Sequence, residues 1–176
     1  MTNRTRKCII AIISIIALLS LLFIFGNSLK DSSESSEQSI AVKEMLIKIL
    51  SVFGIKGDIN IALLRNLAHV AEFALLGVCL STLALHFARR KGNVSFARYA
   101  AFLGASMGVG ALIAIVDELL QLMSAGRACE LKDALLDFLG VILGTAVACF
   151  IYWLFVKIKL WLIQKNKEKE KICKNT

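Results

Sequence analysis

Residues 115–140, IVDELLQLMSAGRACELKDALLDFLG, decide the fold. They contain five acids: Asp117, Glu118, Glu130, Asp133 and Asp137. Two apolar runs flank them, YAAFLGASMGVGALIAIV at 99–116 and VILGTAVACFIYWLFV at 141–156. Apolar runs of about 20 residues are typical of membrane-spanning helices. The pattern therefore predicts a helical hairpin whose two spans meet at a carboxylate-rich turn.

The rest of the chain extends this prediction to an all-α, polytopic membrane protein. Hydrophobic residues make up 57% of the 176 residues and charged residues 19%, whereas soluble domains have about a quarter charged residues. We expect one domain over residues 1–176, built as a four-transmembrane-helix bundle. Its predicted spans are about 8–26, 61–85, 97–117 and 134–156. The first is expected to be retained, because no A-x-A-like cleavage site follows it.

A further helix is predicted between the first two spans. Residues 40–54, IAVKEMLIKILSVFG, place apolar side chains on one helical face. Such an amphipathic helix is expected to lie flat at the outer membrane interface, or to pack against the mouth of the bundle. The preceding stretch, GNSLKDSSESSEQS at 26–39, is polar and rich in serine.

Charge predicts the orientation. The chain has a net charge of +8, and most of its 21 Lys and Arg residues lie in the N-terminus, the second connection and the tail at 157–176. By the positive-inside rule, these segments face the cytoplasm. Both termini are therefore expected to be cytoplasmic, with the first and third connections outside. The basic tail indicates a solvated segment attracted to the lipid bilayer, and no nucleic-acid partner is expected.

The polar residues of the spans are then predicted to gather at the outer face. Arg65, His69 and Glu72 stack on one side of the second span, at i, i+4 and i+7. An isolated Asp or Arg near the bilayer centre costs about 2.5–3.5 kcal/mol, so we expect these side chains to face the bundle interior and meet partners. The predicted ligand-binding residues are Asn27, Ser28, Arg65, His69, Glu72, Asp117, Glu118, Gln121, Arg127, Asp133 and Asp137.

Spaced glycines predict close helix packing. Gly104 and Gly108 form a G-x-x-x-G pattern in the third span, and Gly140 and Gly144 form another in the fourth. Small residues at this spacing let two backbones approach.

Three motifs resemble the VanZ-like family of small bacterial membrane proteins. The stretch 117–144 matches the family's acidic pair, Gln, Gly-Arg, two Asp four apart and spaced glycines. RNLAHVAEFALLG at 65–77 resembles its helix with a His followed by Glu, and 25–39 resembles its serine-rich segment. Leu120 and Ala125 depart from the family's common aromatic or His and its Pro, so no His role is carried over at Leu120. The resemblance implies a place in the bacterial cytoplasmic membrane and an association with resistance to the glycopeptide teicoplanin, but no reaction.

Several functions fit the predicted polar mouth, by which we mean the outer ends of the spans with the predicted ligand-binding residues. One function is to bind or shield a lipid-linked envelope precursor, or to alter the access of a lipoglycopeptide to it. In that case Arg65 and Arg127 would hold phosphate or carboxylate. Alternatively, a membrane-embedded hydrolase or transferase would use the catalytic candidates His69, Glu72, Asp117 and Glu118 as acid and base.

Two further alternatives concern ions and structure. The carboxylate cluster is oxygen-rich and suits Mg²⁺ or Ca²⁺ better than Zn²⁺; no other metal or cofactor is expected. The same residues could also have a purely structural role, as a polar network that joins the helix ends and binds no ligand. Transport is disfavoured, because the inner halves of the spans offer no polar path.

Overall fold

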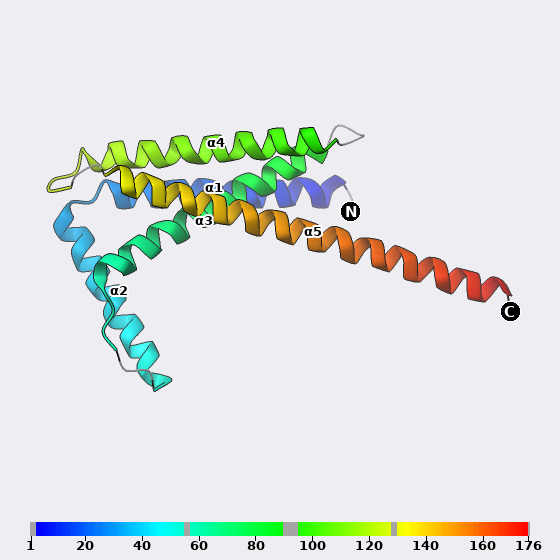
Figure 1. Cartoon of the computed structure of the whole chain (residues 1–176), viewed down its shortest axis with the longest axis horizontal. Helices are drawn as coiled ribbons and strands as arrows, with labels where there is room; N and C mark the ends of the chain where they lie inside the picture. Colours follow the sequence, from blue (N-terminus) through cyan, green and yellow to red (C-terminus); the bar gives the residue numbers. More distant parts are fainter. Residues whose placement is uncertain (1–2, 55–56, 90–94, 128–129, 176) are drawn as a thin grey trace.

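The computed structural model describes residues 3–54, 57–89, 95–127 and 130–175, with side chains up to Lys167. The described residues form five helices and no strand, so the all-α prediction is confirmed (Figure 1). The helices are α1 (Asn3–Ser28), α2 (Ser32–Val52), α3 (Ile61–Ala88), α4 (Phe96–Gln121) and α5 (Leu131–Asn175).

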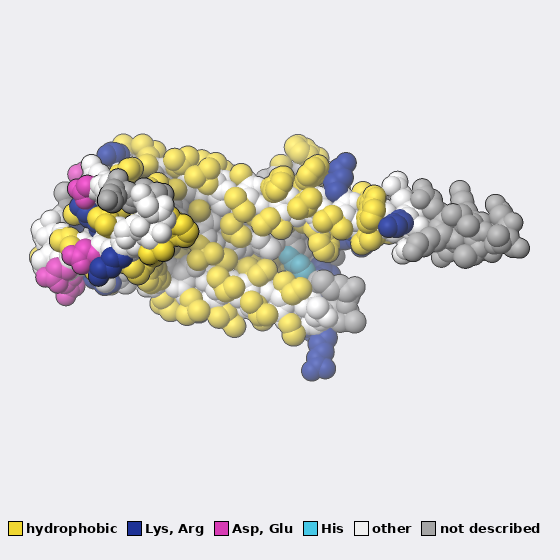
Figure 2. All heavy atoms as spheres, turned by 90° about the horizontal axis from the view of Figure 1, so that it is seen from below, with side chains coloured by type: hydrophobic (Ala, Val, Ile, Leu, Met, Phe, Trp, Pro, Cys, Tyr) yellow, Lys and Arg dark blue, Asp and Glu magenta, His cyan; other side chains and the backbone are white. Residues whose placement is uncertain are grey.

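Four of these helices, α1, α3, α4 and α5, are long and apolar enough to cross a membrane. Their outward side chains are apolar along most of their length, and the yellow surface in Figure 2 covers the middle of the molecule. Leu22, Leu112 and Phe150 are 62%, 64% and 60% exposed. Such exposure is unfavourable in water but is expected of side chains that face lipid tails. The chain is therefore a multi-pass membrane protein.

Helix α3 is the centre of the bundle and packs against α1, α4 and α5. The buried core joins Ile24 of α1, Phe73 and Leu76 of α3, Ala114 of α4 and Val141 of α5. These side chains hold the helices together near the end of the bundle that carries the predicted polar residues.

The predicted glycine pair of α5 does bring two backbones together. A Cβ atom on Gly140 would lie 2.6 Å from the carbonyl oxygen of Val70, and one on Gly144 would overlap the carbonyl oxygen of Ala74. On the other side of the contact, a Cβ on Gly77 would lie 2.6 Å from the carbonyl oxygen of Val141. Larger residues would therefore force α3 and α5 apart.

The prediction for Gly104 and Gly108 was wrong. A Cβ atom at either position would meet nothing within 4 Å. The buried face of α4 instead runs through Ser106, Gly110 and Ala114, where a Cβ on Gly110 would lie 2.6 Å from Val141 Cγ1. Because two residues correspond to about 200° of helical turn, Gly104 and Gly108 lie on the side of α4 away from the bundle.

Helix α2 starts eight residues earlier than the predicted 40–54. Asp31 caps it by accepting the N–H of Glu34 at 2.9 Å. The serines of the polar stretch before residue 40 donate to carbonyls one turn back: Ser36 to Ser32 at 2.7 Å, and Ser39 to Ser35 at 2.9 Å. Serine hydroxyls satisfied in this way are compatible with a helix.

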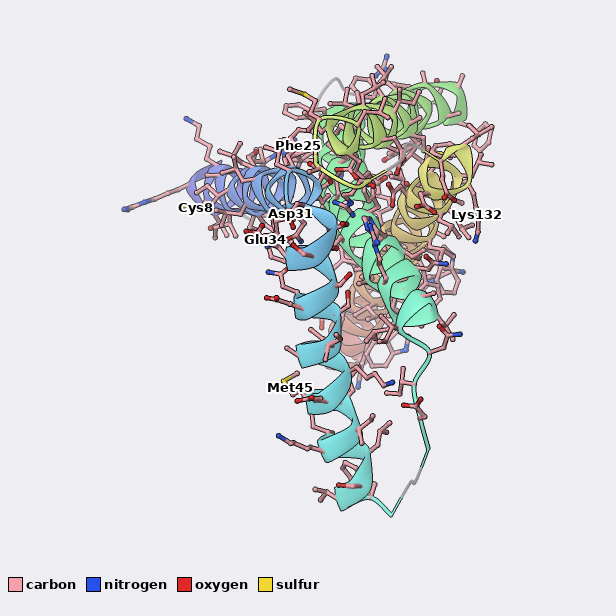
Figure 3. All side chains as sticks on the ribbon, turned by 90° about the vertical axis from the view of Figure 1, so that its left-hand side faces the viewer. Cys8, Phe25, Asp31, Glu34, Met45 and Lys132 are labelled. Atoms are coloured by element: carbon pink, nitrogen blue, oxygen red, sulfur yellow. The ribbon has the colours of Figure 1, made fainter. Side chains whose placement is uncertain are left out.

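The apolar side of α2 is open. None of its residues is buried, and Met45 is 56% exposed. The helix leaves the bundle at a steep angle, as Figures 1 and 3 show. Lys43 binds Asp58 of the following connection at 2.7 Å, and this bond holds the pKa of the Asp58 carboxyl below its usual value. An open apolar side and a steep angle fit the predicted interfacial helix, which remains a prediction.

The two ends of the bundle differ in character. We call the end where α1 and α4 stop and α3 and α5 start the polar end; it lies on the left in Figure 1. The opposite end, where α1 and α4 start and α3 stops, is the basic end. Both chain termini lie on that side, and α5 extends past it without a break into the predicted tail.

Candidate functional site

Asp117 is the centre of a hydrogen-bond network at the polar end. Its carboxylate is fully buried and accepts the hydroxyl of Ser28 from α1 at 2.5 Å. It also accepts the side-chain amide of Gln121, one turn further along α4, at 3.1 Å. The same amide donates to Glu118 at 3.2 Å. The i, i+4 spacing of Asp117 and Gln121 aligns them on the buried face of α4.

The turn after α4 holds the end of α1. Arg127 Nη1 donates to the backbone carbonyls of Asn27 and Ser28, at 3.2 and 3.3 Å. Ser124 donates its hydroxyl to the carbonyl of Ser28 at 2.9 Å. The last carbonyls of a helix have no partner within the helix, so these donors cap α1. Gly126 makes the turn with φ +74°, a conformation that favours glycine.

The sequence predicted Arg127 as a cation for carboxylates or ligands, and the structure adds this capping role. Its Nε is buried and has no hydrogen-bond partner among the residues that the structure describes. Burial, together with the positive charge of Arg65, lowers the pKa of the Arg127 guanidinium. Two cations that repel each other at a half-buried place favour the binding of an anion between them.

Glu118 lies 2% exposed beside this turn. Its Oε2 accepts the backbone N–H of Glu130, just before α5, at 3.0 Å. The Glu118 carboxylate therefore links the end of α4 to the start of α5. Asp133 is half-buried in the first turn of α5, where a negative charge is favoured by the helix dipole.

Asp137 is completely buried. It is 0% exposed, and within the described part of the chain neither carboxylate oxygen has a hydrogen-bond partner. The nearest cationic candidate is His69, whose Nδ1 lies 3.5 Å from Oδ1. That distance allows an ion pair but is too long for a good hydrogen bond, and His69 Nδ1 is itself without a hydrogen bond. Buried charges in proteins are normally paired or bind a cation, so the pair of Asp137 and His69 is suited to share a proton or to contact a cation.

His69, Asp117 and Asp137 can converge on one point. One candidate ligand atom from each residue lies within 4.8 Å of the other two. They come from α3, α4 and α5, so the site exists only when the three helices are packed. Two carboxylates and an imidazole form a donor set that fits a divalent cation or a shared proton.

A groove of about 410 Å³ opens beside this cluster, between α1, α2 and α3. Its wall carries three cations, Lys30, Arg65 and Arg127, together with His69 and Glu72. Glu72 accepts the Asn27 amide at 3.4 Å, and Lys30 donates to the oxygen of the same amide at 2.9 Å. The groove is thus mixed in charge. Figure 3, which views this end of the molecule, shows α2 descending from the end of α1 beside the start of α3.

The structure places all eleven predicted ligand-binding residues at the polar end. Nine belong directly to the network or to the His69–Asp137 pair; Arg65 lines the groove and Asp133 lies on the first turn of α5. Sequence reasoning missed Ser124 and Lys30, because single Ser and Lys residues near helix ends carry no spacing signal. It also missed the mid-bundle contact of Ser81 with Thr145 at 2.8 Å, since small hydroxyls are common in apolar spans.

Comparisons with known proteins agree with the motifs. Searches of curated proteins and of solved structures found no match. The model of the family described as VanZ/LLP1 matches residues 11–155, which include all four predicted spans in most of their length and the whole polar network. The chain therefore belongs to the VanZ/LLP1 family.

Proposed function

We propose that the polar end binds the phosphate-bearing head of a lipid-linked cell-envelope component at the outer face of a bacterial cytoplasmic membrane. The observation that carries the proposal is the pair of neighbouring cations, Arg65 and Arg127, on the wall of one groove. An anion between them would relieve their repulsion. Arg is well suited to this, because its planar guanidinium matches phosphate oxygens.

The size and surroundings of the groove support a lipid head as ligand. Its volume of about 410 Å³ lies within the usual range of small-molecule sites, about 300–1,000 Å³. Phe23, Val42 and Leu64 also line it, so apolar chain next to the head would find contacts. Helix α2 borders the groove, and its exposed apolar side suits the interface between head groups and tails.

The orientation follows from the positive-inside rule, which puts the basic end in the cytoplasm and the polar end outside. There, a bound envelope precursor would be shielded from a glycopeptide that acts from outside the cell. This shielding connects the site with the teicoplanin-type resistance that the family resemblance implies.

The test uses the purified full chain in lipid nanodiscs and a photo-crosslinking polyprenyl phosphate. We expect crosslinks in the groove and labelling that falls at least fivefold in Arg65→Gln. Lys48→Gln and Lys132→Gln are matched controls, because they remove one charge each from the same region without lining the groove. Equal labelling of Arg65→Gln and the controls, or no crosslink in the groove, would contradict the proposal.

A second candidate function rests on the convergence of His69, Asp117 and Asp137. Such a cluster is suited to acid–base chemistry or to a divalent cation in a hydrolase or transferase that acts on the same lipid-linked class of substrate. Mg²⁺ or Ca²⁺ would be held by the two carboxylates, with the imidazole as a third contact.

The enzyme alternative is tested by metal analysis of purified protein together with product analysis of the incubated lipid. Asp137→Asn should abolish metal content and turnover, whereas Glu130→Gln, an exposed acid at the same end outside the three-residue cluster, should keep both. Turnover by metal-free protein would exclude the cation version. Intact lipid after prolonged incubation with wild-type protein would exclude the enzyme.

A further inference from the structure

A second groove lies at the basic end, far from the polar network. Its inner part is an apolar slot of about 320 Å³ between α1, α3 and α5. The slot is lined mainly by aliphatic and aromatic side chains, among them Ile9, Ile13, Leu85, Ile151 and Phe155. Helix α1 packs on α3 and α4, and the slot separates it from α5.

The slot continues into a basic hollow of about 590 Å³. The two share His86, Arg89 and Phe155, so they form one groove that is apolar at depth and charged at its mouth. Arg6 and Lys159 complete the mouth. Figure 2 shows a cyan histidine together with dark blue side chains where α5 leaves the rest of the bundle.

The charge of this mouth is one-sided. Arg6, Arg89 and Lys159 line it, and the described residues that line the slot and the hollow include no Asp or Glu. Arg6 Nε donates to His86 Nε2 at 2.8 Å, which fixes the half-buried Arg6 side chain at the edge of the groove. Because three cations and no carboxylate are found among the described lining residues, the electrostatic potential of the mouth favours an anionic ligand.

The depth of the mouth matches that of a lipid head group. Lys159 lies on α5 between Trp153 and Trp161, and Trp is enriched where a membrane meets water. Lys157 and Lys165 lie over the rings of these two Trp residues, at 5.8 and 4.9 Å from the ring centres, rather than in the groove. Long basic side chains at this level reach the head-group layer while their stems stay in apolar surroundings.

We propose that this groove binds one anionic phospholipid from the leaflet that the basic end reaches. Its phosphate lies at Arg6, Arg89 and Lys159, and one acyl chain fills the apolar slot. The slot and the charged mouth are continuous, which fits a molecule with both parts better than a free phosphate. A zwitterionic lipid fits less well, because its ammonium group would be placed against three cations. Bound in this way, the lipid bridges α1 and α5.

The test is native mass spectrometry of the purified full chain, titrated with phosphatidylglycerol or phosphatidylcholine, with thermal unfolding in detergent as a second readout. Wild-type protein should retain one tightly bound phosphatidylglycerol and gain thermal stability from it. The triple variant Arg6→Gln, Arg89→Gln, Lys159→Gln should bind at least tenfold more weakly and lose the stabilisation.

The matched control is the triple variant Lys7→Gln, Lys157→Gln, Lys165→Gln. It removes the same charge from the same end, but none of the three lines the groove. A slot variant, Ile151→Trp, should weaken phosphatidylglycerol binding while all three cations remain.

Three outcomes would overturn the proposal: equal loss in both triple variants, equal retention of phosphatidylcholine, or full stabilisation by soluble glycerol phosphate. The last would identify a free-phosphate site. The groove variants lie at the end of the bundle opposite Arg65, so the result is independent of the function proposed for the polar end.

Discussion

The polar end and the basic end differ in where their charged side chains lie: the central acids of the polar end are buried between helices, and most of the described cations of the basic end are exposed. At the polar end, Asp117, Glu118 and Asp137 are at most 2% exposed and lie between helices. At the basic end, Arg89 and Lys159 are exposed and open to whatever surrounds the protein. A short Asp side chain cannot reach the head groups from within a span and must find partners inside, whereas a long Lys or Arg can extend to the membrane surface.

The difference implies that the polar end contributes to stability through protein contacts and the basic end through lipid contacts. In the polar network, removal of one member leaves buried partners unsatisfied. At the basic end, Arg89 and Lys159 are exposed, so removal of either disturbs fewer contacts inside the protein. The following predictions test this contrast in order of decreasing effect.

The largest effect is expected for Asp117→Ala. One N–H of the buried Gln121 amide would lose its acceptor, because the amide's other bond goes to Glu118, and the Ser28 hydroxyl would keep only the carbonyl of Ile24. An unsatisfied buried donor costs about 1–3 kcal/mol, so we expect the free energy of unfolding to fall by about 2 kcal/mol. Denaturant titration in mixed micelles measures it. Leu119→Ala, on the exposed side of α4, is the control, and a loss of equal size there would refute the network's role.

The double variant His69→Leu, Asp137→Val should act in the opposite direction. His69 Nδ1 lies 3.5 Å from Oδ1 of the buried Asp137, so replacing both residues removes the pair as a whole and leaves neither charge behind. Replacement of a whole buried ion pair by apolar residues is often neutral or stabilising, and we expect a gain of about 1 kcal/mol in unfolding free energy. Ligand crosslinking at the polar end should fall at the same time. A loss of stability would instead mean that the pair holds the fold.

A smaller effect is expected in the middle of the bundle. Ser81 and Thr145 share a hydrogen bond at 2.8 Å between α3 and α5, where no charge is involved. Hydrogen bonds between membrane helices contribute about 0.6 kcal/mol on average, so Ser81→Ala should lower the unfolding free energy by about that amount. The double variant with Thr145→Val closes a mutant cycle. A coupling energy as large as that at Asp117 would remove the contrast between the polar end and the rest of the bundle.

The smallest effect concerns pH at the start of α2. The N–H of Glu34 and the hydroxyl of Ser33 lower the pKa of Asp31. A carboxyl with a lowered pKa in the folded state stabilises it above the unfolded pKa of about 3.9, and this contribution is lost as the pH falls through the folded value. The protection factors of the first turn of α2 in hydrogen exchange, which are corrected for the intrinsic pH dependence of amide exchange, should therefore fall below about pH 4. Asp31→Asn keeps a capping oxygen and should remove the pH dependence.

Several features of the site were predictable because they depend on helical periodicity. The stacking of Arg65, His69 and Glu72 follows from their spacing alone. The same reasoning failed at Gly104 and Gly108, because a small-residue pattern does not say which side of α4 faces the bundle. The start of α2 was missed because serine is ambiguous: its hydroxyl can end a helix or bond back to the preceding turn.

The sequence by itself determined the number of spans, the concentration of carboxylates at one end, the excess of bases at the other, and the family. These follow from hydropathy, charge and local motifs, which are properties of neighbouring residues. Only the tertiary structure decided that Arg127 caps α1, that Glu118 binds the N–H of Glu130, and that Asp137 lies buried beside His69 without a hydrogen bond. These contacts join residues that are distant along the chain, and the one between His69 and Asp137 depends on how α3 and α5 approach at Gly140 and Gly144, which no local pattern specifies.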